Sequence, residues 1–192
     1  FPNPYSPPPK NKTVFLLVSK FSFFKTGPRS TVQVLRSSSM WSVGITKPEH
    51  SILNAYYKLI DKAKHYIYIE NQFFVSKSYT NEELEQSGAN VSRIVQNEIA
   101  LHIRQRIEKA YEKKENFHVF VFIPLLPGFA GEPESSSTLQ IILKHTMAGI
   151  SHNSGLSIFE KLYEKMGEKA HDYISFYSLR GHTIIDNIPI TE

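Results

Sequence analysis

The sequence predicts an α/β fold, with a mostly parallel sheet that carries helices on both faces. Short apolar runs alternate along the chain with longer segments whose apolar residues recur at helical spacing. One run, residues 117–126, has little polar content, which is typical of a central parallel strand covered on both faces. Strands that alternate with helices in this way form βαβ units, and the strands of such units are parallel.

The first third of the chain contains a linker, two strands and a helix. Residues 1–12 are rich in proline and are predicted to form an extended linker, whereas residues 13–192 are predicted to form an incomplete α/β domain. We expect strands at 13–18 and 31–36. A helix is expected to begin near Lys47-Pro48 and to run to residue 64, because its apolar side chains recur at three- and four-residue spacing.

The rest of the chain continues the alternation. The order predicts a βαβ series without an internal repeat. The expected elements are a strand at 65–74, an exposed loop at 76–89, a helix at 90–114, a strand at 117–126, a loop at 130–137, helices at 138–150 and 157–169, and a strand at 173–179.

The composition excludes several classes of protein. The 192 residues, 41% of them hydrophobic, suit one domain or a large part of one. The absence of cysteine excludes disulfides, zinc–thiolate sites and thiol catalysis. The sequence contains no run of 18 apolar residues and therefore predicts no membrane-spanning helix, and the amino terminus has no signal-peptide pattern. The net charge of +4 favours phospholipid headgroups or nucleic acid as partners, but scattered lysines also suit an ordinary solvated surface.

The strand at 65–74 contains three adjacent polar side chains, Glu70, Asn71 and Gln72. A buried polar group without a partner costs a few kcal/mol, so the triplet is expected at the carboxyl end of the strand, where open α/β sheets bind ligands. Because side chains alternate along a strand, Gln72 should share the face of Glu70, and Asn71 should point away as a structural residue. The alternative for Glu70 is a structural carboxylate paired with a backbone amide or with Arg36.

Two further features are candidates for a binding role. Trp41, the only tryptophan, lies in a turn rich in Ser and Gly, where its ring could stack on a quaternary ammonium group for ~0.5–2 kcal/mol or enter a lipid interface. The alternative is a packing anchor over the sheet. Glu98 and His102 are four residues apart, which is half of a metal site, but without a third ligand we expect a solvated helix face.

Five segments resemble, in their order and spacing, the eukaryotic-type phospholipase D family. The resemblance extends from about Thr31 to His182. The segments are Val32–Ser37 with Trp41 and Gly44 after it, Ser51–Tyr56, Ile67–Phe74, Ile123–Phe129 and Tyr173–Arg180.

The motif that carries the chemistry of that family is absent from this sequence. The family uses two copies of His-x-Lys-x-x-x-x-Asp, and none of the eight histidines here has Lys two residues later. His102-Ile103-Arg104 comes nearest, but it lacks the Asp. In the family, segments of this kind lie between the two copies. The resemblance therefore implies an inter-motif part of a phospholipase D-like catalytic domain, with no catalytic residue in this chain and no turnover by the chain alone.

The resemblance also implies a function for the longer protein. The expected reaction is hydrolysis of phosphatidylcholine-type phospholipids to phosphatidic acid and a free headgroup through a phosphohistidine intermediate, without metal or cofactor. Glu70, Gln72, Trp41 and Asn71 are the expected substrate-binding residues. The expected partner is a phospholipid membrane surface rather than nucleic acid, and the expected location is cytoplasmic and peripheral to the membrane. The alternatives are a catalytically inactive lipid-binding or scaffolding homologue, and a phosphodiesterase or nuclease of the same superfamily.

Overall fold

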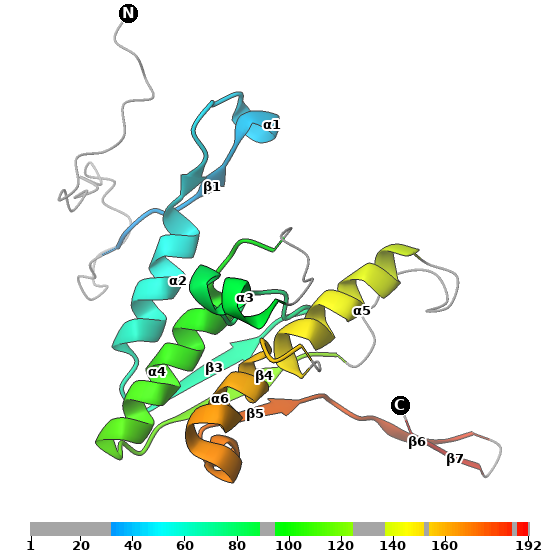
Figure 1. Cartoon of the computed structure of the whole chain (residues 1–192). Coiled ribbons are helices and arrows are strands. Elements are labelled where there is room, and N and C mark those ends of the chain that lie inside the picture. Colours follow the sequence, from blue (N-terminus) through cyan, green and yellow to red (C-terminus); the bar gives the residue numbers. More distant parts are fainter. Residues whose placement is uncertain (1–31, 89–94, 125–136, 152–153, 186–187, 192) are drawn as a thin grey trace, which may run out of the picture. The chain divides into compact units, whose positions relative to one another are not determined.

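The computed structural model describes residues 32–88, 95–124, 137–151, 154–185 and 188–191 (Figure 1). The chain divides into two compact units between Ile52 and Leu53, and each unit is described by itself. The predicted linker at 1–12, the strand at 13–18 and most of the loop at 130–137 lie outside the described residues.

The first unit contains a short antiparallel pair. Strand β1 (Ser37–Ser38) pairs with β2 (Glu49–His50), and the one-turn helix α1 (Met40–Val43) lies between them in sequence. A strand is expected over residues 31–36, but the described residues 32–36 form none. The Arg36 N–H donates to Ser51 Oγ at 2.9 Å, and the Ser51 hydroxyl donates to the Arg36 carbonyl at 2.8 Å. The backbone groups of Arg36 therefore bond to a side chain instead of a neighbouring strand.

The second unit is built on a three-stranded parallel sheet. Its strands are β3 (Tyr66–Glu70), β4 (His118–Phe122) and β5 (Ile174–Tyr177), with β4 in the centre. Tyr66 is opposite His118, and Phe122 is opposite Tyr177. Helix α4 (Ile99–Lys113) connects β3 to β4, and α6 (Ile158–Met166) precedes β5. The α/β class, the parallel sheet and the central place of β4 are confirmed.

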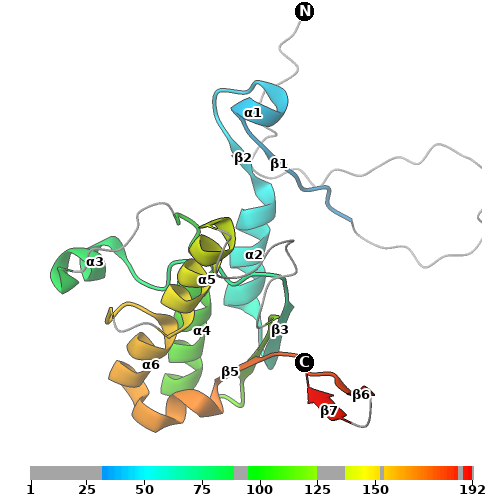
Figure 2. The same ribbon diagram turned by 90° about the vertical axis from the view of Figure 1, so that its right-hand side faces the viewer.

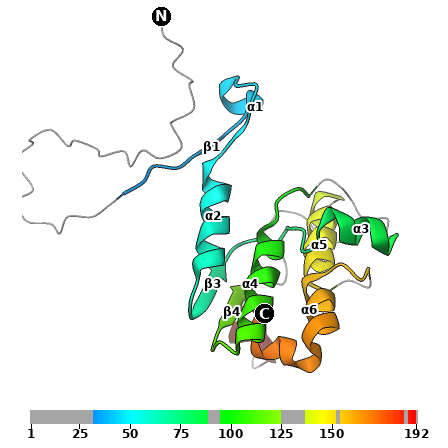
Figure 3. The ribbon, with the colours of Figure 1, turned by 60° about the vertical axis from the view of Figure 1, so that its left-hand side comes forward.

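The remaining elements surround this sheet or follow it. Figure 3 shows α4 between α2 and α6. The bounds are α2 (Ser51–Lys62), α3 (Asn81–Ser87), α5 (Ser137–Ile150), a 3-10 turn (Gly167–Asp172) and an antiparallel hairpin of β6 (His182–Ile185) and β7 (Ile188–Thr191). Within the described residues, no helix is long and apolar enough to cross a bilayer.

The core lies on one face of the sheet. Val119, Val121 and Ile174 of the strands are fully buried, as are Ile103 and Ile107 of α4, and they belong to one apolar cluster. Each such side chain contributes about 1.5–3 kcal/mol. Figure 2 shows α4 and α6 on the same side of the strands. Burial of β4 alternates strictly, because its valines point to this cluster while His118, Phe120 and Phe122 stay half-buried. The second helical layer that the sequence predicts is not among the described residues.

The segment from β3 to α4 differs from the prediction in three ways. The strand expected over 65–74 ends at Glu70, and α4 begins at Ile99 rather than at residue 90. The loop expected at 76–89 contains α3. The start of α4 has a physical reason, because Ser76 Oγ accepts from the Ala100 N–H at 2.8 Å and the Lys77 carbonyl accepts from the Leu101 N–H at 3.0 Å. The loop after β3 thus supplies the acceptors that the first turn of a helix lacks.

Candidate functional site

A cavity of about 230 Å3 lies at the carboxyl end of β3. In open α/β sheets this end of a strand is where ligands bind. Its described lining comes from β3, the loop after it, α2 and the start of α4, and consists of Tyr56, Tyr68, Ile69, Glu70, Asn71, Phe73, Phe74, Val75, Ser76 and Ile99. The polar triplet therefore begins at the rim of a cavity, at the strand end that the sequence analysis predicts.

Glu70 is exposed and is held by a neighbour on its own strand. The Tyr68 hydroxyl donates to Glu70 Oε2 at 2.8 Å, and the Tyr68 ring packs on Phe122 with centroids 5.3 Å apart. The hydrogen bond to Glu70 raises the pKa of the Tyr68 phenol, so the phenol stays protonated and donates at neutral pH. Arg36, the suggested structural partner, forms its ion pair with Glu49 at 2.6 Å.

Asn71 and Gln72, the other two residues of the polar triplet, occupy different environments. The Asn71 side chain donates to the Phe73 carbonyl at 3.0 Å, and the backbone N–H of Asn71 donates to the Phe122 carbonyl at 3.1 Å. Asn71 thus shapes the turn after β3, as a structural residue would, yet it also lines the cavity. Because β3 ends at Glu70, strand alternation does not extend to Gln72, which is exposed and outside the described lining. A shared face of Gln72 and Glu70 therefore stays a prediction.

Trp41 belongs to the other unit of the chain. It lies on α1, and its side chain is 90% exposed. Gly44 ends this helix with φ of 72°, in the left-handed region that glycine adopts without strain. Within its own unit Trp41 packs against nothing that buries it, and contact with a ligand or with lipid stays a prediction.

The side chains of Glu98 and His102 form ion pairs, and the ring of His102 also packs on a tyrosine. The His102 ring stacks on Tyr57 with centroids 4.1 Å apart, and its Nδ1 lies 2.8 Å from Asp61 Oδ1. Glu98 pairs with Lys77 at 2.8 Å. Among the residues described, no group of three or more His, Cys, Asp or Glu side chains could hold a metal ion.

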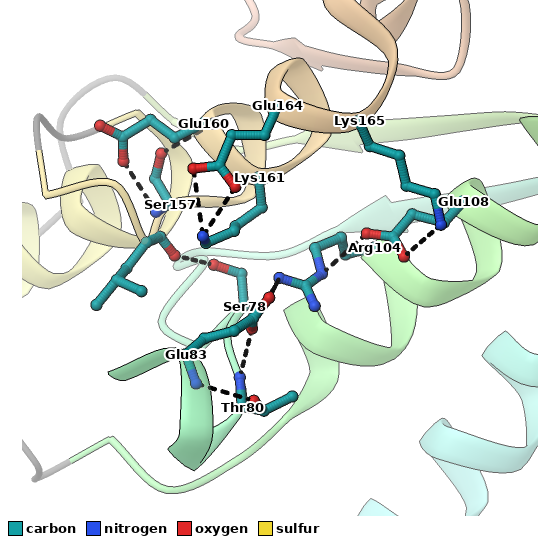
Figure 4. A network of polar contacts seen from close by, with 11 residues as sticks. Ser78, Thr80, Glu83, Arg104, Glu108, Ser157, Glu160, Lys161, Glu164 and Lys165 are labelled. Carbon is teal, nitrogen blue, oxygen red and sulfur yellow. Dashed lines mark hydrogen bonds and ion pairs between the residues drawn. The ribbon is translucent and has the colours of Figure 1, made fainter. Parts of the chain in front are cut away.

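A polar network that the sequence analysis did not anticipate supports the loop after β3 (Figure 4). The buried Ser78 hydroxyl donates to the Leu156 carbonyl at 2.6 Å, which joins this loop to the segment before α6. The guanidinium of Arg104, on α4, reaches both Glu83 oxygens at 2.9 and 3.0 Å and lies 3.2 Å from Glu108. These contacts hold the loop, α3 and α4 together.

Glu83 is the centre of this network and also caps α3. Thr80 accepts from the Glu83 N–H at 3.2 Å, and the Glu83 carboxylate accepts from the Thr80 N–H at 2.8 Å. Burial alone would raise the pKa of the Glu83 carboxyl, but the Thr80 amide and the Arg104 guanidinium outweigh it and hold the pKa below its ordinary value. Thr80-Asn81-Glu82-Glu83 matches the capping-box pattern, so the sequence contained the signal for α3.

Comparison with known proteins gives one consistent result. The phospholipase D family model matches residues 18–189. The chain is 41% identical over 161 residues to phospholipase D zeta 1 of Arabidopsis thaliana, and 37% identical over 165 residues to phospholipase D1 of Homo sapiens. It is 36% identical over 181 residues to phospholipase D1 of Saccharomyces cerevisiae. These matches cover 82%, 85% and 92% of this chain, but only 14%, 14% and 10% of the respective relatives.

Proposed function

Because the chain belongs to the phospholipase D family, we propose that it is one part of a phospholipase D that hydrolyses phosphatidylcholine-type phospholipids. The products would be phosphatidic acid and the free headgroup. The observation that carries the proposal is the family match over residues 18–189, and the cavity rim at Glu70 supports it. The proposal concerns a longer protein, since the chain spans 14% of the length of the plant and human relatives.

The chemistry divides between this chain and sequence outside it. One histidine would attack the phosphorus while a second histidine protonates the departing headgroup oxygen, and water would then hydrolyse the phosphohistidine. Neither histidine is expected from this chain, because it contains no His-x-Lys sequence. The chain would contribute substrate-binding residues instead: Glu70 and Asn71 at the cavity, with Gln72 beside them and Trp41 on the other unit.

The proposed partner is the surface of a phospholipid membrane, which the protein would approach from the cytoplasmic side as a peripheral protein. The net charge of +4 favours approach to anionic headgroups, although a modest surplus of lysines gives only weak attraction. We do not propose nucleic acid as a partner, because the basic residues alternate with acids instead of forming a basic face.

The test uses the longer protein that contains residues 1–192 and vesicles of phosphatidylcholine. We expect choline release from the intact protein, and at least about a tenfold loss in Glu70→Gln, which keeps the size of the side chain but removes its charge. Glu85→Gln is the matched control, because Glu85 is exposed on α3. Residues 1–192 alone should release none.

Two results would contradict the proposal. One is choline release by residues 1–192 alone. The other is an intact protein with both His-x-Lys-x-x-x-x-Asp motifs that releases no choline. Broken motifs on either side of this chain would instead favour the catalytically inactive lipid-binding homologue.

A further inference from the structure

We propose that Asn97, which lies just before α4, is a positioning residue for the proposed reaction, because its side chain holds one wall of the cavity at β3. The inference rests on the proposed function. It goes beyond that function by giving a role to a residue outside the described cavity lining. The sequence pattern does not single out Asn97, since the helix is expected to begin at residue 90 and to include it.

Two hydrogen bonds of the Asn97 amide group join separate parts of the cavity lining. Its Nδ2 donates to the Val75 carbonyl at 2.9 Å, and its Oδ1 accepts from the Ile99 N–H at 3.4 Å. Val75 belongs to the loop after β3, Ile99 is the first residue of α4, and both line the cavity. Because the bond to Val75 is the shorter one, it is the stronger of the two.

The backbone of Asn97 strengthens the same connection. Its carbonyl accepts from the Ser76 hydroxyl at 3.2 Å and from the Lys77 N–H at 3.1 Å. The Ser76 hydroxyl in turn accepts from the Ala100 N–H at 2.8 Å. These bonds do not use the Asn97 side chain. A substitution of that side chain should therefore leave the loop joined to the start of α4 and remove only the hold on Val75.

The residues on either side of Val75 are supported by other elements. The buried Phe74 ring packs edge-to-face on Phe176 of β5, with centroids 5.1 Å apart. The carbonyls of Phe74 and Ser76 lie against α5, where a Cβ at Gly149 would come within 3.6 and 3.1 Å of their oxygens. The Val75 carbonyl between them bonds to Asn97 instead. Val75 is therefore the part of this wall whose position depends on Asn97.

A shift of Val75 would change the orientation of a bound substrate more than its attraction to the site. Glu70 is the one charged residue of the described lining, and it lies on β3, outside the loop that Asn97 holds. The electrostatic part of binding should therefore persist. Orientation is more sensitive, because a misplacement of about 1 Å can lower a rate about 100-fold. Loss of the bond from Asn97 should thus lower kcat more than it raises KM.

The test replaces Asn97 by Asp in the longer protein that contains residues 1–192. Ionised aspartate has the size of asparagine and keeps an oxygen that can accept from the Ile99 N–H, but it has no donor for the Val75 carbonyl. With vesicles of phosphatidylcholine, we expect kcat to fall at least about tenfold and KM to change by less than about threefold. An unchanged kcat, or a change confined to KM, would overturn the proposal.

Two controls separate positioning from a general effect on the fold. Asn116→Asp makes the same chemical change at an exposed residue before β4, at the opposite end of the parallel strands from the cavity, and should leave kcat within about twofold. Ile107→Val shortens a fully buried side chain of α4, which lowers stability without changing a contact of the wall. If Ile107→Val lowers kcat as much as Asn97→Asp does, Asn97 acts through stability and the proposal is wrong.

The methyl NMR signals of valine report on the wall without requiring turnover. In the longer protein with labelled valine methyl groups, the Val75 signal should shift or broaden in Asn97→Asp and stay unchanged in Asn116→Asp. The signal of Val119, which is fully buried in the core, should stay unchanged in both variants. An unchanged Val75 signal in Asn97→Asp would show that the wall does not depend on Asn97.

The two measurements separate the positioning role from the proposed function. If the longer protein hydrolyses phosphatidylcholine but Asn97→Asp leaves kcat unchanged, the positioning role is wrong and the function stands. If the longer protein hydrolyses no lipid, the function is wrong, and the Val75 signal still decides whether Asn97 holds the wall.

Discussion

At the scale of single residues, Arg104 shows how burial changes the value of an ion pair. Its side chain is only 7% exposed, and its partners Glu83 and Glu108 are 27% and 19% exposed. In the pair of Lys161 and Glu164, which has a similar N–O distance of 2.9 Å, the lysine is 15% exposed and the glutamate, the partner removed in the control below, is 60% exposed. Removing one partner of a buried pair leaves an uncompensated charge, whereas an exposed pair is solvated by water when it breaks.

We therefore predict that Arg104→Met is strongly destabilising. The free energy of unfolding should fall by about 3 kcal/mol, at the lower end for a broken buried pair because both glutamates keep some contact with solvent. Glu164→Gln, the control, should change it by less than about 0.5 kcal/mol. Urea denaturation measures both variants. Losses of similar size in the two variants would show that the Arg104 network does not stabilise the fold.

The carboxyls of Glu83 and Glu160 make stability depend on pH. Burial raises the pKa of Glu160, but hydrogen bonds from Ser157, Gly155 and Leu156 outweigh it and hold the pKa below its ordinary value, as in Glu83. A carboxyl whose folded-state pKa is lowered stabilises the fold at pH values above its unfolded pKa of about 4.3. That contribution is lost as the pH falls through the folded-state pKa.

We predict that Glu160→Gln weakens this acid sensitivity. Glutamine can also form a capping box, so the cap at Ser157 should persist while the titrating group is removed. The urea midpoint of the unsubstituted chain should fall between pH 6 and pH 3.5, and the midpoint of Glu160→Gln should fall by less. Glu85→Gln, at an exposed site on α3, should follow the unsubstituted chain. A parallel fall in all three proteins would count against the capping carboxyl.

At the scale of elements, α5 approaches the loop after β3 closely at Gly149. A Cβ at this position would lie 3.1 Å from the Ser76 carbonyl oxygen and 3.6 Å from that of Phe74. Ser76 has little freedom to move away, because its hydroxyl caps the start of α4 at Ala100. The contact is therefore with an anchored backbone rather than with the end of a flexible side chain.

We predict that Gly149→Ala destabilises the chain, against the usual effect in a helix. Alanine normally stabilises a helix interior by about 0.5–1 kcal/mol relative to glycine. Here the close contact should outweigh that gain and lower the free energy of unfolding by about 1–3 kcal/mol, as overpacking does. Lys144→Ala, on the exposed side of the same helix, should stay within about 0.5 kcal/mol of the unsubstituted chain. A more stable Gly149→Ala would show that the loop yields.

Elements with a complete local signal were predictable from the sequence. The apolar run at β4 predicted a strand, and the helical spacing of α2 and α5 predicted the type and nearly the bounds of these helices. The start of α4 was not predictable, because the groups that cap it come from Ser76 and Lys77, more than 20 residues earlier. The capping box of α3 was visible at Thr80 and Glu83, but the polar composition around it favoured a loop.

At the scale of the whole molecule, the sequence revealed the family and one side of the site. Five spaced segments predicted the family, and an abrupt polar triplet placed Glu70 at a strand end. Tyr68 looked like an ordinary outward-facing strand residue, and the place of Tyr56 beside the cavity depends on how α2 packs along β3. The position of Tyr56 therefore follows from the tertiary structure rather than from the local sequence pattern.

The sheet presents an aromatic face that the described helices leave uncovered. Tyr66, Tyr68 and Tyr177 are 65%, 55% and 42% exposed. Phe122 lies between two of these rings, with centroid distances of 5.3 Å to Tyr68 and 5.0 Å to Tyr177. Parallel sheets are generally covered on both faces, and a contiguous exposed apolar patch of this kind is rare on soluble proteins.

We predict that residues 1–192 bind the dye ANS (8-anilinonaphthalene-1-sulfonate) through this face while folded. Replacing Tyr66 and Tyr177 together by Thr should reduce ANS fluorescence by at least about half, because threonine suits an exposed strand but adds little apolar surface. Both proteins must keep the near-UV circular dichroism signal of a packed fold, since loosely packed states also bind ANS. A well-packed unsubstituted chain without ANS fluorescence would contradict the prediction. Unchanged fluorescence in the double variant would place the dye elsewhere, so the aromatic face would not be the exposed patch that these side chains suggest.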